Sequence, residues 1–218
     1  MIILNNINQG FSASTSVTLT GRVSSADEVI VISVSEDSGG TPAVTFNGNN
    51  VPASATSASL AAVASASIYV YSNPPVGSYS VTATQASASH LNITVMSFLG
   101  VSKRSQNFIN AITTSVGAAN PTLSVQIASA NSVIIDTYYN SGEAVVMTPN
   151  TGQIQIANLT DTSSNRYLIS YKYTQPGVQT MGWADPNADL YAYVAVVLEP
   201  DDAPSIWYPN VTLRNSVD

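Results

Sequence analysis

The only histidine of the chain, His90, is the first residue to weigh for chemistry. A Ser–His–Asp triad would need its imidazole in a pocket beside a nucleophile and an acid. His90 lies instead in an alternating segment, on the same strand face as Asn92 and Thr94, which is typical of a solvent-facing or hydrogen-bonded histidine. A metal site built on several histidines or on thiolates is excluded, because the chain has one histidine and no cysteine.

Three oxygen-bearing residues at alternate positions, Asp185, Asn187 and Asp189, form the one candidate calcium site. The glycine and the distal glutamate of an EF-hand loop are missing. A connection between two strands uses the same residue types, because Asp and Asn favour turns. We therefore predict no metal and no other cofactor, with calcium at these three residues as the alternative.

Paired carboxylates for glycoside hydrolysis must face each other across a cleft. Most acidic residues of this chain lie in expected turns, and Asp136 is the acid that lies within an expected strand. A single acid in a strand is more typical of an edge charge or of a hydrogen-bonded structural residue. We therefore predict that the protein is not an enzyme.

Aromatic side chains offer a different chemistry, because an aromatic face can stack on a sugar ring. Trp183, Tyr191 and Tyr193 are the candidate residues of such a ligand platform. The alternative, which we favour, is that the tyrosines close the margins of a core with their hydroxyl groups outward.

Short alternating segments separated by turn residues make up most of the chain. Residues 67–84 contain two of them, joined by Asn73-Pro74-Pro75-Val76-Gly77, which cannot continue a ladder because proline lacks an N–H. We predict that these two segments pair as antiparallel strands. Further strands are expected at residues 29–35, 43–46, 90–98, 122–128, 133–139, 154–159, 166–173, 179–183 and 190–199, and a weak one within 54–66. This spacing predicts an all-β sandwich or barrel.

The chain of 218 residues has few charged side chains, 9% of the composition, and a net charge of -7. Ordinary domains have about 25% charged residues. Interface centres are depleted in charge, so a neutral surface suits a protein that packs against copies of itself; compositional drift in a secreted or phage-borne domain is the alternative. The negative net charge argues against nucleic acid as a partner. We find neither a membrane-spanning apolar stretch nor the features of a secretory signal at the start.

Five motifs in a fixed order carry a resemblance. They are DEVIVISVSEDSGG, VTFNG, SIYVYSNPPVGSYSVTAT, NITVMSFLGV and YVAVVLEP, and they cover residues 27–200. Their order resembles that of a family of β-sandwich modules found in structural proteins of tailed phages and in bacterial surface proteins. The resemblance implies a jelly-roll-like sandwich used for assembly or attachment, and it supplies no catalytic residues.

Together these observations predict an all-β protein: an antiparallel, jelly-roll-like β-sandwich with extended N- and C-terminal arms. Residues 1–21 form an N-terminal arm and first strand, 22–200 the sandwich domain and 201–218 a C-terminal arm. We expect a virion structural protein, such as a capsid decoration subunit or a head or tail surface subunit. Its partners would be further copies and other virion proteins such as the major capsid protein. The alternative is a carbohydrate- or receptor-binding module that contacts surface glycans. The predicted assembly residues in the arms are Ile2, Ile3, Leu4, Ile206, Trp207 and Tyr208.

Overall fold

The computed structural model describes residues 1–23, 25–37, 40–58, 64–103, 111–116, 119–141, 145–160, 164–187 and 190–201. Within these ranges the regular elements are all strands. The first half contains β1 (Ile3–Ser12), β2 (Ser16–Val23), β3 (Val29–Glu36), β4 (Ala43–Phe46), β5 (Asn49–Val51), β6 (Ala55–Ala58), β7 (Ser65–Tyr71), β8 (Gly77–Thr84) and β9 (Leu91–Leu99). The second contains β10 (Ala111–Val116), β11 (Thr122–Ile127), β12 (Ser132–Ser141), β13 (Thr148–Pro149), β14 (Ile154–Thr160), β15 (Arg166–Thr174), β16 (Gly177–Ala184) and β17 (Leu190–Leu198). No helix capable of crossing a membrane is found in the described ranges.

The first half is a sandwich of two sheets with the strand orders β1-β9-β3-β7-β6 and β2-β8-β4-β5. Opposed sheets β1-β9-β3-β7 and β2-β8-β4-β5 are the two layers of a jelly roll, with β6 added beside β7. Central strand β3 is buried along its whole length, as expected for its apolar sequence. The predicted all-β, jelly-roll-like sandwich is therefore confirmed.

The connection at residues 72–76 has a different role from the one predicted. β7 pairs with β3 and β6, whereas β8 pairs with β2 and β4. The prediction of a hairpin was wrong: the proline-rich link carries the chain from one sheet to the other. The Asn47-Gly48 turn, in contrast, forms a hairpin between β4 and β5, and both residues have positive φ, 49° and 78°.

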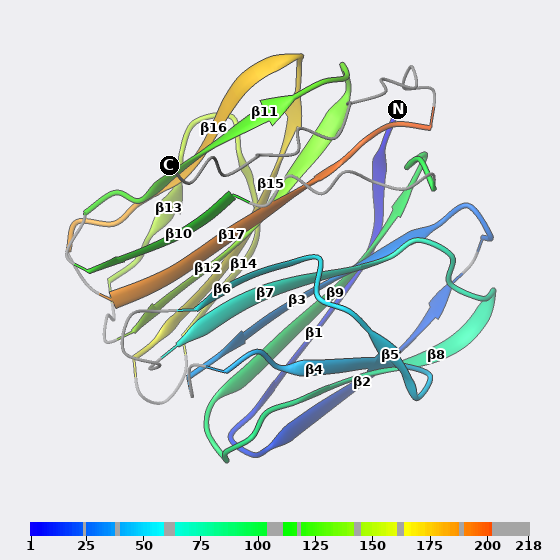
Figure 1. Cartoon of the computed structure of the whole chain (residues 1–218), viewed down its shortest axis with the longest axis horizontal. Helices are drawn as coiled ribbons and strands as arrows, with labels where there is room; N and C mark the ends of the chain where they lie inside the picture. The colour runs from blue at the N-terminus through cyan, green and yellow to red at the C-terminus, as the bar shows by residue number, and fades with distance from the viewer. Residues whose placement is uncertain are drawn as a thin grey trace, which may run out of the picture.

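The second half repeats the strand order of the first. Its sheets are β10-β17-β12-β15-β14 and β11-β16-β13, so β10, β17, β12, β15 and β14 occupy the places of β1, β9, β3, β7 and β6. The halves lie beside each other, the first in blue to cyan-green and the second in green to orange (Figure 1). The chain thus contains two similar sandwiches in tandem.

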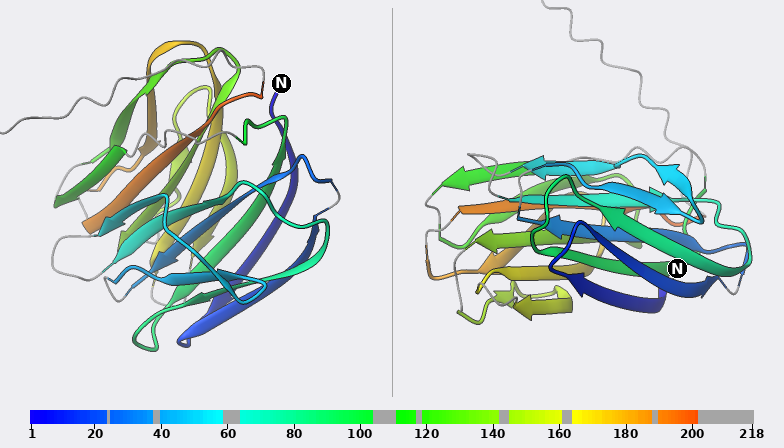
Figure 2. Two further views of the ribbon diagram at one scale, coloured as in Figure 1. Left: turned by 45° about the vertical axis from the view of Figure 1, so that its right-hand side comes forward. Right: turned by 90° about the horizontal axis from the view of Figure 1, so that it is seen from below.

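A third core joins the halves, because their two five-stranded sheets face each other. β6 and β7 pack on β17, and β3 packs on β12. Apolar residues of both sheets, including Val31, Ile68, Ile135, Val194 and Leu198, form one buried cluster there. Figure 2 shows this close packing of the two halves from two further sides. The result is four layers of sheet with an apolar core between each successive pair.

The chain ends are placed as follows. Residues 1–21, predicted as an arm and a first strand, form β1 and most of β2, and β1 is hydrogen-bonded to β9 from Ile3 to Ser12. The N-terminal residues therefore form paired strands of their own sandwich, where an extended arm was predicted. Ile206, Trp207 and Tyr208 lie outside the described residues, which end at Asp201.

Candidate functional site

The longest edge strand in the described sheets is β1. It comprises ten residues, ILNNINQGFS, without a charged residue or a proline. Within the described residues its one strand partner is β9, so its other side is unpaired. Edge strands are usually protected by charges, prolines, bulges or short length, because unpaired backbone groups are a template for another strand. β1 has one such feature, an irregularity between Leu4 and Asn6.

Three large apolar side chains of β1 are exposed: Ile3 by 50%, Ile7 by 41% and Phe11 by 45%. Ile7 and Phe11 stand opposite Met96 and Asn92 and thus share one face of the strand, while Ile3 stands opposite Leu99 on the other face. We call these three residues the β1 strip. Together with the unpaired edge they form the described surface best suited to a further strand.

The predicted N-terminal assembly residues, at and just before the start of β1, differ in their burial. Ile2 is completely buried in the core between the halves, and Leu4 is partly buried against that core. Ile2 therefore offers no exposed surface to a neighbouring copy, and Leu4 offers only part of its side chain. Ile3 alone among them is exposed.

The predicted ligand platform is not on the surface. Trp183, Tyr191 and Tyr193 have exposed fractions of 0%, 2% and 0% and lie in the core of the second half. Tyr138 packs among them, with its ring centroid 6.5 Å from that of Trp183 and 5.4 Å from that of Tyr193. The prediction of a platform is corrected, because alternation along β16 and β17 places these side chains between two sheets.

The candidate calcium residues are used by the fold. Asp185 is buried, and its Oδ2 accepts hydrogen bonds from the Tyr138 hydroxyl and from Asn140 Nδ2, each at 2.8 Å. Its Oδ1 accepts from the backbone N–H of Asn187 at 3.0 Å, which closes a turn. Asp189 lies outside the described residues. Among the described residues no group of three His, Asp or Glu side chains is placed to hold a metal ion.

Asp136, the acid within a strand, is buried and accepts several hydrogen bonds. Its Oδ1 accepts from the backbone N–H and the hydroxyl of Ser170 at 2.8 and 2.7 Å, and its Oδ2 accepts from the Tyr193 hydroxyl at 2.7 Å. Burial raises the pKa of Asp136 from 3.8 to about 6, although the hydrogen bonds from Ser170 and Tyr193 lower it. Burial also raises the pKa of the Tyr193 hydroxyl, which therefore remains a donor. This arrangement ties β12 to β15 and β17.

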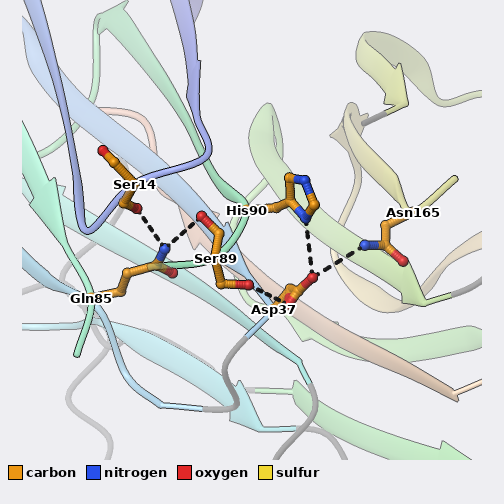
Figure 3. Close-up of polar contacts among 6 residues, drawn as sticks. All are labelled: Ser14, Asp37, Gln85, Ser89, His90 and Asn165. Atoms are coloured by element: carbon orange, nitrogen blue, oxygen red, sulfur yellow. Dashed lines mark hydrogen bonds and ion pairs between the residues drawn. The ribbon is translucent and has the colours of Figure 1, made fainter. Parts of the chain in front are cut away.

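His90 belongs to a polar cluster around Asp37 (Figure 3). Its Nδ1 lies 3.2 Å from Asp37 Oδ2, and the Ser89 hydroxyl donates to Asp37 Oδ1 at 2.7 Å. A catalytic triad needs the serine hydroxyl on the imidazole, whereas here serine and histidine both contact the carboxylate. Asn165 Nδ2, from the second half, also approaches Asp37 Oδ2, at 3.4 Å. The cluster therefore connects loops of the two halves, and we call it the Asp37 clasp.

One small cavity lies between the halves, close to 10 Å³ in volume. It is lined by Ser33, Ser35, Asn92, Thr94, Ala157, Leu159, Tyr167 and Ile169. This volume corresponds to about one water molecule and is too small for an organic substrate.

Comparison with known proteins identifies no relative: no family model, no curated protein and no solved structure matches the chain. The site must therefore be interpreted from its own geometry.

Several residues of interest were not predicted from the sequence. Ile7, Phe11 and Asp37 are not among the candidate site residues that the sequence motifs indicate. The signal for the β1 strip was present, because the run from Ile3 to Ser12 is long, uncharged and free of proline. No local signal marks the Asp37 clasp, since its members come from positions as far apart as 37 and 165.

Proposed function

We propose that the protein is a non-enzymatic structural subunit that assembles with copies of itself through β1. The observation that carries this proposal is the unpaired ten-residue edge with the exposed β1 strip. Pairing with a further strand satisfies its free backbone groups and covers apolar side chains in one step.

The composition supports the same conclusion. A chain in which only 9% of the residues are charged has few charges to desolvate when its surface is covered. A contact of about 800 Å² on each partner is typical of a stable interface. The net charge of -7 opposes the approach of copies, so added salt should strengthen assembly by screening this repulsion.

The particular setting that we propose is a virion, where the subunit would decorate a capsid or lie on the surface of a head or tail. The support for this setting is the resemblance of the five ordered motifs to modules of tailed-phage structural proteins. The partners would then be further copies and virion proteins such as the major capsid protein. Mass spectrometry of purified phage particles produced from a genome that encodes this chain tests this setting, and absence of the chain from intact particles overturns it.

Assembly itself is tested by size-exclusion chromatography with light scattering over a range of protein and salt concentrations. We expect a defined oligomer that dissociates on dilution and strengthens with salt. Ile7→Lys places a charge in the β1 strip and should lower the mass toward that of the monomer. Val178→Lys is the matched control, because Val178 is 67% exposed on β16 and lies outside the β1 strip. A monomer at all concentrations overturns the proposal.

Carbohydrate binding is the second candidate function, and one observation supports it. Tyr173 is 45% exposed and its ring packs edge-on against Tyr171, with centroids 5.7 Å apart. This pair could contact a sugar ring in place of the buried residues that were predicted. Binding on a glycan array that disappears in Tyr173→Ala would favour this second function.

A further inference from the structure

The described chain ends beside the start of β1. The backbone N–H of Asp201 donates to the carbonyl of Gly100 at 3.0 Å, and Val101 and Pro200 form a β-bridge. Gly100 packs against the backbone of Met1, so closely that a side chain there would collide with the Met1 carbonyl. The orange end of the chain after β17 accordingly lies next to the N-terminus in Figure 1. The described part of the chain thus ends, at Asp201, close to where the exposed edge begins.

Seventeen residues follow Asp201, and their composition suits a strand that covers an apolar edge. Ile206 and Tyr208 alternate, as do Val211 and Leu213, and Pro209 separates the two pairs. We call residues 202–218 the tail. An extended chain advances about 3.3 Å per residue, so the path from Asp201 to Leu213 reaches about 40 Å. The distance along β1 from Ile3 to Phe11 is about 26 Å on the same basis, which the tail exceeds.

We propose that the tail of one copy adds as a strand to β1 of a neighbouring copy. This inference rests on the proposed function and names the donor and the acceptor of the contact. Main-chain hydrogen bonds to the free edge would supply the affinity, and the apolar residues of the tail would cover Ile7 and Phe11. The acceptor strand has no charged residue, so no charge on it must be desolvated.

Strand direction favours a neighbouring copy over the same chain. The tail and β1 start at the same end of the molecule, so a tail on its own β1 would run parallel to it. Every strand pair described in both five-stranded sheets is antiparallel. Antiparallel pairing is slightly more stable per residue, and a tail from another molecule can approach in that direction.

A complementation experiment tests the exchange. One variant lacks residues 202–218 and keeps β1; the other is the full chain carrying Ile7→Lys, which keeps the tail and has a damaged acceptor. Each alone should be a monomer by light scattering. Mixed, they should form a complex of one copy each, because the tail of the second can occupy β1 of the first. The control is the full chain carrying Val178→Lys in place of Ile7→Lys. It should assemble with copies of itself, without the truncated variant.

A synthetic peptide of residues 202–218 provides a second readout. By fluorescence anisotropy it should bind the truncated chain, and Ile7→Lys in that truncated chain should weaken binding at least tenfold. Circular dichroism of each variant verifies that the fold is retained.

The possible failures can be distinguished. If the full chain assembles and Ile7→Lys lowers its mass while the truncation does not, tail exchange is wrong and assembly through β1 stands. If neither variant changes the mass, assembly through β1 is overturned as well. If the full chain is a monomer and the truncated chain binds the peptide, the tail covers its own β1, and both proposals are overturned. If the mixed variants do not associate and the peptide does not bind, the tail is not the donor.

Discussion

The hydroxyl groups of Ser33 and Thr137 lie 2.6 Å apart in the buried core between the two halves. Ser33 is on β3 and Thr137 on β12, the middle strands of the two facing sheets, and neither is exposed by more than 2%. One hydroxyl donates and the other accepts, so each has a hydrogen-bond partner within the core. This hydrogen bond is a directional contact between two sheet faces whose other buried contacts are mainly apolar.

Removing both partners of this pair should cost less stability than the sum of the two single removals. Thr137→Val keeps the shape but leaves the buried Ser33 hydroxyl without this partner, so we expect a loss of about 1–3 kcal/mol in the free energy of unfolding. Ser33→Ala should be similarly unfavourable. The double variant should lose clearly less than the sum, and urea unfolding of all four proteins gives the coupling energy.

Thr18 and Thr82 provide a matched comparison, because their hydroxyl groups form a hydrogen bond of 2.8 Å that is exposed. Water can replace either partner there, so the corresponding Val substitutions should change stability by less than about 0.5 kcal/mol, with no measurable coupling. Equal coupling in the buried and the exposed pair would contradict the role assigned to Ser33 and Thr137.

Asp136 should make stability fall as pH rises from about 4 to 6. Its pKa is raised from 3.8 to about 6 in the fold, so between these values the folded state binds the proton more strongly than the unfolded state. The cost of burying the charge is absent below pH 3.8 and fully present above pH 6, where it reaches about 3 kcal/mol. Asp136→Asn removes this titration, so its stability relative to the unsubstituted protein should rise through this interval.

Tyr193→Phe tests the same site by changing the hydrogen-bond donor in place of the acid. It removes a hydrogen bond that favours the carboxylate, and the pKa of Asp136 should therefore rise further. Chemical unfolding at closely spaced pH values measures both effects. Parallel stability profiles for Asp136→Asn and the unsubstituted protein would show that Asp136 does not titrate in this range.

Asp37 should hold together loops that belong to different halves. Asp37→Ala removes the acceptor of Ser89 and Asn165 and the partner of His90. Because the site is partly exposed, water can replace these contacts, and the global loss should be about 1 kcal/mol. Amide hydrogen exchange should nevertheless increase at residues 85–90 and 164–166. Asp27→Ala, at an exposed acid elsewhere, is the control, and equal exchange in both variants would contradict the clasp.

Strands were predictable from the sequence, whereas their partners were not. The alternation in residues 67–84 correctly indicates two strands, but a stiff link with two prolines suits a hairpin and a crossing between sheets equally well. Ile2 and Leu4 show the same limit, because an apolar chain end can be an arm or an edge strand, and only the partner strand decides. The Asp37 clasp depends on residues more than 100 positions apart, and no local pattern carries that information.

An aromatic residue in a strand, such as Trp183, can belong either to a ligand platform or to the core, and its burial decides between the two. Its side chain is fully buried, so Trp183→Ala should lower the free energy of unfolding by about 3–5 kcal/mol through lost apolar contacts and a cavity. Tyr173→Ala, at a side chain that is 45% exposed, should change it by less than about 1 kcal/mol. Urea unfolding followed by circular dichroism separates the two. If Trp183→Ala had little effect on stability and abolished glycan binding, Trp183 would instead belong to an exposed sugar-binding platform.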